Sequence, residues 1–99
     1  WLVTMDEVPG DFRDMKLTTR LNGIVMQDSD LGKLCFDVSD LISYYSQIFY
    51  FQPGDMIATG TPGGVGSRRD PPVWMKPGDE LEVEITSIGI LKNTVAGEN

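Results

Sequence analysis

The alternation of apolar and polar side chains over residues 15–22 predicts a half-buried β-strand. The apolar and smaller side chains of this segment share one face: Leu17, Thr19 and Leu21. The dipeptide Asn22-Gly23 follows directly, and it readily adopts the positive φ angles of a type I′ turn. We therefore expect residues 24–27 to return antiparallel as a hairpin and the polar residues 28–33 to form a loop.

The period of the apolar positions changes to about 3.6 residues after position 37, which predicts a helix. Asp37 is its expected N-cap, and Asp40 stands at the third helical position, where it completes a variant of the capping box. The apolar positions share one stripe, which we interpret as core packing rather than as a cofactor site: Val38, Leu41, Ile42, Tyr45, Ile48 and Phe49. Cys35 is expected to be a buried small hydrophobe, because no base stands near it in the sequence.

Two segments share one turn design, Gln52-Pro53-Gly54-Asp55 and Lys76-Pro77-Gly78-Asp79. Proline presets φ at about −65° in the second position, and glycine supplies a positive φ in the third. Each segment is therefore predicted to be a type II turn that leads into a strand. The strands expected after the turns cover residues 56–58 and 81–85, and a last strand covers residues 88–95.

One helix among several strands makes the expected fold class mainly β, of the α+β type. A chain of 99 residues forms one domain at most. Residues 1–4 are strand-like and begin without methionine, so we expect residues 1–99 to be a single partial domain that continues a preceding element.

Composition and charge narrow the classes of function. Eight Lys and Arg residues against fifteen Asp and Glu residues give a net charge of −7, which disfavours nucleic acid and anionic membrane surfaces as partners. The sequence contains no histidine, which excludes Ser-His and Cys-His nucleophile pairs built from this chain alone. A single cysteine excludes an intrachain disulfide, and no apolar run approaches the roughly 18 residues of a membrane span. We expect a cytoplasmic protein.

The segment with the most chemical information is TGTPGGVG, residues 59–66, directly after an expected strand. Glycines let several backbone N–H groups converge on one anion, and a threonine hydroxyl adds a donor. The segment does not match a nucleotide-binding P-loop, because Ser67 and Arg68 follow the last glycine where a lysine and a hydroxyl residue are needed. Two interpretations stay open on this pattern: a tight loop between strands, or a site for a carboxylate or phosphate.

Acidic side chains project from one face of the strand expected at residues 81–85: Glu80, Glu82 and Glu84. Carboxylates two residues apart can bind Mg²⁺, but the opposite face is apolar and suits a core, so we interpret the acidic face as solvated. We also interpret as solvated the charged side chains that follow the glycine-rich segment: Arg68, Arg69, Asp70 and Lys76.

Several motifs follow one another in a specific order. They are WLVT (residues 1–4), LTTRLNG (17–23), FDVSDLI (36–42), PGDMIATGTP (53–62), GVG (64–66) and KPGD (76–79), with Gly89 after them. In this order and spacing the chain resembles the C-terminal portion of the fumarylacetoacetate hydrolase family, over residues 1–95.

The resemblance implies a mixed, mostly β roll and chemistry on 2-oxo acids with Mg²⁺ or Mn²⁺ as cofactor. It implies that Thr61 holds the carboxylate of a small-molecule 2-oxo acid substrate, helped by the backbone of Gly60. The family's metal ligands, catalytic lysine and lid residues are expected upstream of the matched region, so no catalytic or metal-binding residue is assigned in this chain. Glu82-Val83-Glu84 imitates the family's metal-binding pair, but its place corresponds to a strand that does not bind metal.

We therefore expect the chain to be part of a divalent-metal-dependent enzyme of aromatic catabolism that hydrolyses a C–C bond of an acylpyruvate-like substrate. Isomerisation of the 2-hydroxyhepta-2,4-diene-1,7-dioate type and decarboxylation stay open, because the residues that discriminate between them are expected in the upstream lid. A non-catalytic β module that binds a small acid is the alternative from another class. The resemblance also implies that the complete protein is a homodimer and that residues 1–99 are inactive without the upstream part.

Overall fold

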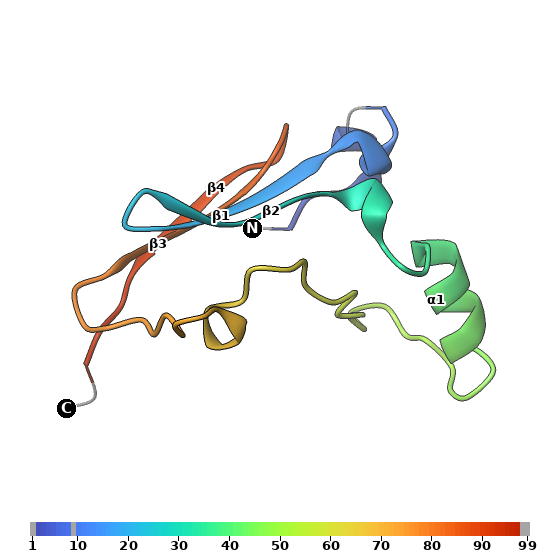
Figure 1. Ribbon diagram of the computed structural model, residues 1–99. Coiled ribbons are helices and arrows are strands. Elements are labelled where there is room, and N and C mark those ends of the chain that lie inside the picture. The colour runs from blue at the N-terminus through green and yellow to red at the C-terminus, as the bar shows by residue number, and fades with distance from the viewer. Residues whose placement is uncertain (1, 9, 98–99) are drawn as a thin grey trace.

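The computed structural model describes residues 2–8 and 10–97 and places them in an arch (Figure 1). In chain order its elements are 3-10 helices at Met5–Glu7 and Phe12–Asp14, β1 (Lys16–Leu21), β2 (Ile24–Asp30), a 3-10 helix at Leu31–Lys33, α1 (Val38–Tyr45), a 3-10 helix at Gly66–Arg68, β3 (Glu80–Ile85) and β4 (Gly89–Thr94). The expected α+β class is confirmed, because the described residues form one antiparallel sheet with α1 at one end of the arch.

The sheet has the strand order β2-β1-β3-β4, and each neighbouring pair is antiparallel. Asn22 and Gly23 join β1 to β2 with φ angles of 51° and 78°, so the predicted hairpin with its type I′ turn is confirmed. On the other side of β1, Leu21 lies opposite Leu81 of β3. This register aligns the apolar face of β1 with the apolar face of β3, the two faces that the alternation in each strand indicates.

β2 carries a bulge at its centre. Thr19 of β1 pairs with Gln27, whereas the next residue, Arg20, pairs with Val25. Met26 is therefore an extra residue in β2, and its backbone groups are released from regular pairing. Because β2 is also an edge strand of the sheet, a neighbouring segment can bind to the strand at this point.

α1 begins as the sequence predicts. Asp37 Oδ1 accepts a hydrogen bond from Val38 N at 2.7 Å, and Asp40 Oδ2 accepts one from Asp37 N at 3.3 Å, as part of a complete capping box. The helix ends at Tyr45, one turn short of Phe49, where the apolar stripe ends. Within residues 2–8 and 10–97, no helix is long and apolar enough to cross a membrane.

The apolar stripe predicted over residues 38–49, which begins in α1 and extends beyond it, does not form a core. Ile42, Ile48 and Phe49 are 46%, 65% and 48% exposed. The aromatic rings contact one another instead, with centroids 5.9 Å apart for Tyr45 and Phe49 and 5.3 Å apart for Phe49 and Phe51. The expectation of core packing is therefore wrong for the described structure, because no other described element packs closely on this helix.

Both proline–glycine turns have the predicted geometry. Asp55 N donates to Gln52 O and Asp79 N donates to Lys76 O, each at 3.0 Å, and the third-position glycines have φ angles of +103° and +92°. In each turn the aspartate side chain also accepts a hydrogen bond from the first residue's backbone N at 2.7 Å. The second turn leads directly into β3, as predicted.

Other expectations are wrong in the described structure. Residues 28–30, predicted as loop, belong to β2 because they pair with β1. Residues 56–58 and residues 2–4 have strand-like patterns but form no strand, because no described strand pairs with them and a strand needs a partner for its backbone groups. Trp1 lies outside the described residues. Cys35 is exposed rather than buried, because it lines an open hollow under the arch.

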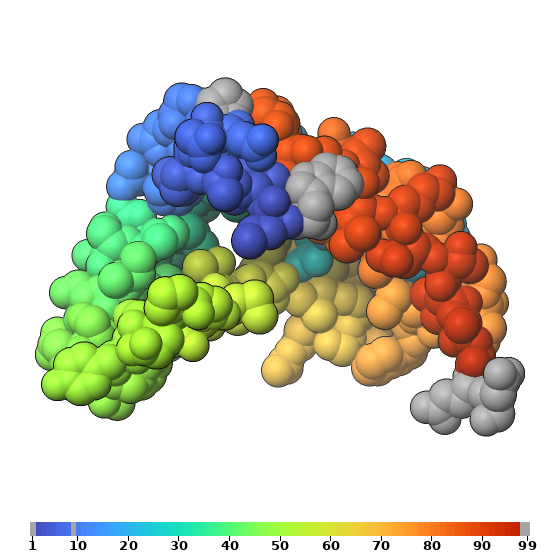
Figure 2. Space-filling view, turned by 180° about the vertical axis from the view of Figure 1, so that it is seen from behind, coloured from blue at the N-terminus to red at the C-terminus, as the bar shows by residue number. Residues whose placement is uncertain are grey.

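Few apolar side chains are covered. Among the described residues, Met15 and Leu21 are the buried hydrophobic ones, at 5% and 8% exposure. The radius of gyration is 15.9 Å, above the value of about 13 Å for a compact chain of 100 residues. The segment between α1 and β3 returns beneath the sheet, and the space-filling view shows the open underside of the arch (Figures 1 and 2).

Candidate functional site

The segment 59–62 lines a hollow of about 290 Å³ beneath the sheet. Polar side chains from the end of β2 and the following 3-10 helix line it as well: Ser29, Asp30 and Lys33. Its apolar lining includes Leu17, Leu31 and Leu34. This volume lies near the lower end of the range for small-ligand pockets, roughly 300 Å³, and the combination of apolar and polar lining is typical of them.

Gly60 and Thr61, the substrate-binding residues predicted from the sequence, lie together on this hollow. Gly60 has a φ angle of +112°, which L side chains rarely adopt, although a Cβ there would meet nothing within 4 Å. Backbone conformation, rather than lack of space, therefore favours glycine at this position. Thr61 is exposed, so a small molecule in the hollow can reach it.

Gln27 holds the same loop from β2. Its side-chain Nε2 donates to Thr61 Oγ1 and to Pro62 O, each at 2.8 Å. Nothing in the sequence predicts this role of Gln27, because the alternation along β2 indicates only which face of the sheet the residue occupies. No local signal connects it to a loop 34 residues further along the chain.

The second half of the glycine-rich segment is fixed to the bulge in β2. Arg69 Nη2 donates to the carbonyl oxygen of Met26, the extra residue of the bulge, and Arg69 Nε donates to Gly64 O at 3.1 Å. A Cβ at Gly64 would lie 2.1 Å from Met26 O, so only glycine permits this approach. The interpretation of Arg69 as a solvated charge is wrong, because its guanidinium fork joins two backbone carbonyls.

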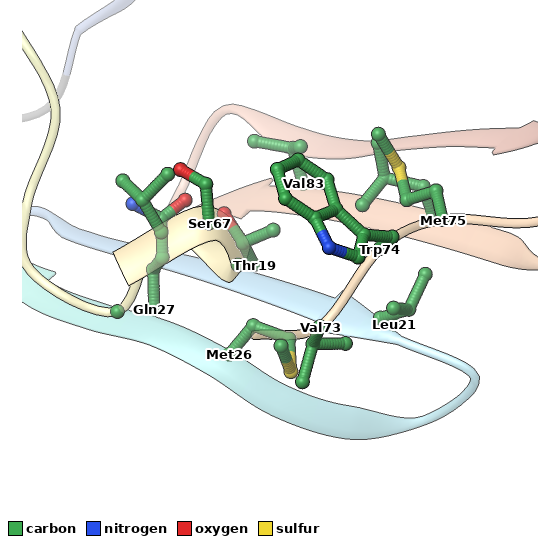
Figure 3. Close-up of a pocket in the computed structure, with 13 residues that line it drawn as sticks. Thr19, Leu21, Met26, Gln27, Ser67, Val73, Trp74, Met75 and Val83 are labelled. Atoms are coloured by element: carbon green, nitrogen blue, oxygen red, sulfur yellow. The ribbon is translucent and has the colours of Figure 1, made fainter. Parts of the chain in front are cut away.

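A second hollow, of about 380 Å³, lies between the sheet and residues 64–75 (Figure 3). The lining is mainly apolar: Leu21, Met26, Val73, Trp74, Met75 and Val83. Gln27 lines this second hollow while its amide binds Thr61, which lines the first. Gln27 thus stands between the two hollows.

The charged groups at the first hollow form an ion pair. Lys33 Nζ lies 2.8 Å from Asp30 Oδ2, and the two side chains are 69% and 49% exposed. The hydrogen bond from Lys33 lowers the pKa of Asp30, and the same bond raises the pKa of Lys33. Both groups are therefore charged at neutral pH, and the hollow keeps an ammonium group at its edge.

The acidic face of β3 is paired with cations from the neighbouring strands. Arg20 Nη1 lies 2.7 Å from Glu84 Oε2, and Lys92 Nζ lies 2.5 Å from Glu80 Oε1 and 3.3 Å from Glu82 Oε1. The sequence predicted that these carboxylates face solvent freely. In the structure they are half-buried. Within the described ranges, no group of three or more His, Cys, Asp or Glu side chains could hold a metal ion. The side chains of the described residues therefore do not offer a donor set that fits a divalent cation.

The fold and the site define the chain as a mainly β domain in which a glycine–threonine loop, residues 59–62, lines a small hollow under a sheet. The sequence profile described as Fumarylacetoacetate (FAA) hydrolase C-terminal matches residues 1–96. The chain belongs to this family, as its ordered motifs indicated.

Similar proteins include enzymes with different named activities. The chain is 47% identical over 94 residues to the human protein "Oxaloacetate tautomerase FAHD2B, mitochondrial", and the match covers 95% of this chain and 30% of that protein. A crystal structure of a putative HpcE protein from Mycobacterium smegmatis is 44% identical with a TM-score of 0.90, over 97% of this chain and 35% of that one. The chain thus spans about a third of the length of these relatives.

Maleylpyruvate hydrolase from Sphingobium sp. SYK-6 is also similar. Its crystal structure in complex with manganese (II) ion and pyruvate has a TM-score of 0.83 and 32% identity, over 97% of this chain and 33% of that one. The family therefore includes hydrolases and tautomerases, and one of its members binds a divalent metal together with a 2-oxo acid.

Proposed function

We propose that this chain forms the acid-binding part of a divalent-metal-dependent enzyme that hydrolyses a C–C bond in an acylpyruvate-like 2-oxo acid. The observation that carries this proposal is the placement of Gly60 and Thr61 on one small hollow. The pyruvate complex of the similar maleylpyruvate hydrolase supports the choice of a 2-oxo acid.

Three features of the hollow suit a small organic acid. The Thr61 hydroxyl can donate a hydrogen bond to a carboxylate, and such a charge-assisted bond is stronger than a neutral one. Lys33 adds an ammonium group, although its pairing with Asp30 and its exposure screen it. The leucine side chains of the lining give the acyl portion of a substrate an apolar surface to pack against.

The metal ligands belong, in this proposal, to polypeptide outside this chain. The described carboxylates of β3 are committed to Arg20 and Lys92, so they do not supply a cation site. Relatives are about three times as long as the region matched here, which leaves room for an upstream metal-binding part. We call the complete protein that contains this chain the parent protein. The cofactor proposed for it is Mg²⁺ or Mn²⁺.

The exposed aromatic and aliphatic side chains support the proposal that residues 1–99 are a partial domain. Ile48, Phe49 and Tyr50 are 65%, 48% and 92% exposed, a surface that a separate stable domain seldom leaves open. We propose that the parent protein covers this surface when it forms its homodimer. It is further proposed to be cytoplasmic, although the similar human protein is named mitochondrial.

Tautomerisation or isomerisation is the second candidate function. The specific observation in its favour is the 47% identity to a protein named oxaloacetate tautomerase. Both reactions start from a bound 2-oxo acid, so the roles proposed for Gly60 and Thr61 are common to them. Decarboxylation and a non-catalytic acid-binding module are the remaining outcomes of the test.

The test uses the purified parent protein with Mg²⁺ or Mn²⁺. We expect cleavage of an acylpyruvate, loss of cleavage with a chelator and recovery when metal is returned. Thr61→Val should weaken substrate binding about tenfold or more, because it removes one hydrogen bond to a charged group, whereas Thr61→Ser should retain most of the affinity. Keto–enol conversion of oxaloacetate without cleavage would favour the tautomerase, and binding of pyruvate without either reaction would favour the non-catalytic module.

A further inference from the structure

We propose that Gln27 is a positioning residue that makes the Thr61 hydroxyl a hydrogen-bond donor toward the carboxylate of the bound acid. The proposal rests on the proposed function, because it concerns the same loop and hollow. In this proposal a residue of the edge strand β2 affects ligand binding through the direction of the Thr61 hydroxyl.

The orientation of the Gln27 amide follows from its two contacts. Pro62 contributes a carbonyl oxygen, which can only accept, so the amide atom 2.8 Å away must be the NH₂ group. The same nitrogen lies 2.8 Å from Thr61 Oγ1. Thr61 therefore receives a donated hydrogen bond, and a lone pair of its oxygen is occupied.

This polarity determines what the Thr61 hydroxyl can do. A hydroxyl has one hydrogen to donate, and it can also accept. With Gln27 as the donor, the hydrogen of Thr61 stays available for a different acceptor, and no described group receives a hydrogen bond from it. A carboxylate can only accept, so the hydroxyl is oriented in advance for a carboxylate in the hollow, and less rotational freedom is lost on binding.

The loop has a second attachment that does not involve Gln27. Arg69 binds both Met26 O and Gly64 O, and it fixes the glycine-rich segment to β2 near Gln27. Loss of the Gln27 amide is therefore expected to leave the loop in place and to change mainly the direction of the Thr61 hydroxyl. A residue that only holds the loop would act through Pro62 O instead, and the two roles can be separated by experiment.

The experiment is a double-mutant cycle in the metal-loaded parent protein, with the dissociation constant for pyruvate as the readout. Gln27→Met keeps the length of the side chain and removes its donor, and Thr61→Val keeps the shape of the threonine and removes its hydroxyl. We expect Gln27→Met to weaken pyruvate binding about 3- to 10-fold in the wild-type background and less than twofold in the Thr61→Val background. Thr61→Ser keeps the hydroxyl and should restore the sensitivity to Gln27→Met.

The controls separate this inference from the function on which it rests. Gln47→Met changes a glutamine after α1 that donates to Ser43 O at 3.3 Å, and it should leave pyruvate binding unchanged. If Thr61→Val itself does not weaken pyruvate binding, the proposed acid site is wrong. If Thr61→Val weakens binding but Gln27→Met has no effect in the wild type, or an equal effect in both backgrounds, the positioning role is wrong while the acid site stands.

A second variant covers the case in which Gln27→Met fails to fold. Gln27→Glu has the same size, but its carboxylate can only accept, so it accepts a hydrogen bond from the Thr61 hydroxyl and directs that hydroxyl away from the ligand. At neutral pH we expect pyruvate affinity to fall at least as far as with Thr61→Val, with melting temperatures reported for both. Unchanged affinity in folded Gln27→Glu protein would overturn the positioning role.

Discussion

The backbone of Gly64 lies against the carbonyl oxygen of Met26, so closely that a Cβ on Gly64 would come within 2.1 Å of that oxygen. Gly64 also has a φ angle of +101°. The carbonyl is available because Met26 is the extra residue of the bulge in an edge strand. One irregularity in β2 thus determines where the second half of the glycine-rich loop attaches.

Gly64→Ala is expected to displace the loop. The contact and the positive φ together should lower the free energy of unfolding by about 2 kcal/mol or more and weaken pyruvate binding in the parent protein. Gly63→Ala is the matched control, since a Cβ at Gly63 would meet nothing within 4 Å. Thermal melting and pyruvate titration measure both effects. Equal behaviour of the two variants would contradict the attachment described here.

Arg69→Lys should loosen the same attachment although it keeps the charge. A lysine cannot reproduce the two donors with which Arg69 binds Gly64 O and Met26 O. We expect destabilisation of about 1–3 kcal/mol and faster amide hydrogen exchange at Arg68 and Val73, whose N–H groups donate to Val65 O and Gly66 O. Arg68→Lys, at an exposed neighbouring position, should change neither quantity. A comparable loss in Arg68→Lys would mean that the guanidinium fork is not the stabilising feature.

Acid should weaken the junction between the hairpin turn and β3. Asn22 Nδ2 donates to Asp79 Oδ1 at 2.9 Å, and this bond, followed by that from Lys76 N, lowers the pKa of Asp79 below its usual value of 3.8. A carboxyl whose pKa is lower in the folded state stabilises the fold above about pH 4. That contribution is lost as the pH falls through the folded pKa.

Two substitutions test this pH dependence through the melting temperature between pH 6 and pH 2. Asp79→Asn should flatten the decrease below pH 4, since it removes the titrating group. Asn22→Gly should flatten it in part, because it removes the main hydrogen bond while glycine tolerates the φ angle of 51° at this position. An unchanged acid limb in both variants would exclude Asp79 as a contributor.

Glu82→Gln and Glu84→Gln should leave the metal requirement proposed for the parent protein unchanged. Both carboxylates are paired with cations on neighbouring strands, Glu82 with Lys92 and Glu84 with Arg20. The metal concentration for half-maximal activity is expected to shift less than twofold. A shift of more than tenfold in either variant would show that the Glu-x-Glu segment of β3 is a metal site after all.

The features that the sequence predicted correctly are local ones. Asn22-Gly23, the Asp37 capping box and the two proline–glycine turns are each specified by neighbouring residues, whose φ preferences and short hydrogen bonds do not depend on the rest of the fold. The placement of Gly60 and Thr61 on one loop followed from their adjacency. The family resemblance supplied the expected role of that loop.

The features that could not be predicted from the sequence depend on partners that are distant along the chain. Residues 56–58 have a strand-like pattern, but pairing requires a neighbour, and the described chain offers none. Gln27 binds Thr61 across 34 positions, and Arg69 binds Met26 across 43, so neither contact leaves a periodic signal in the sequence. Cys35 was judged by its apolar neighbours in sequence, although its burial depends on what covers the hollow.

The most direct test of the account is a crystal structure of the parent protein with its metal and pyruvate. We predict that one carboxylate oxygen of pyruvate lies within hydrogen-bond distance, about 3 Å, of Thr61 Oγ1, with the backbone of Gly60 beside it. Pyruvate bound elsewhere in the protein, with Thr61 Oγ1 facing only solvent, would contradict the assignment of this loop as the acid site.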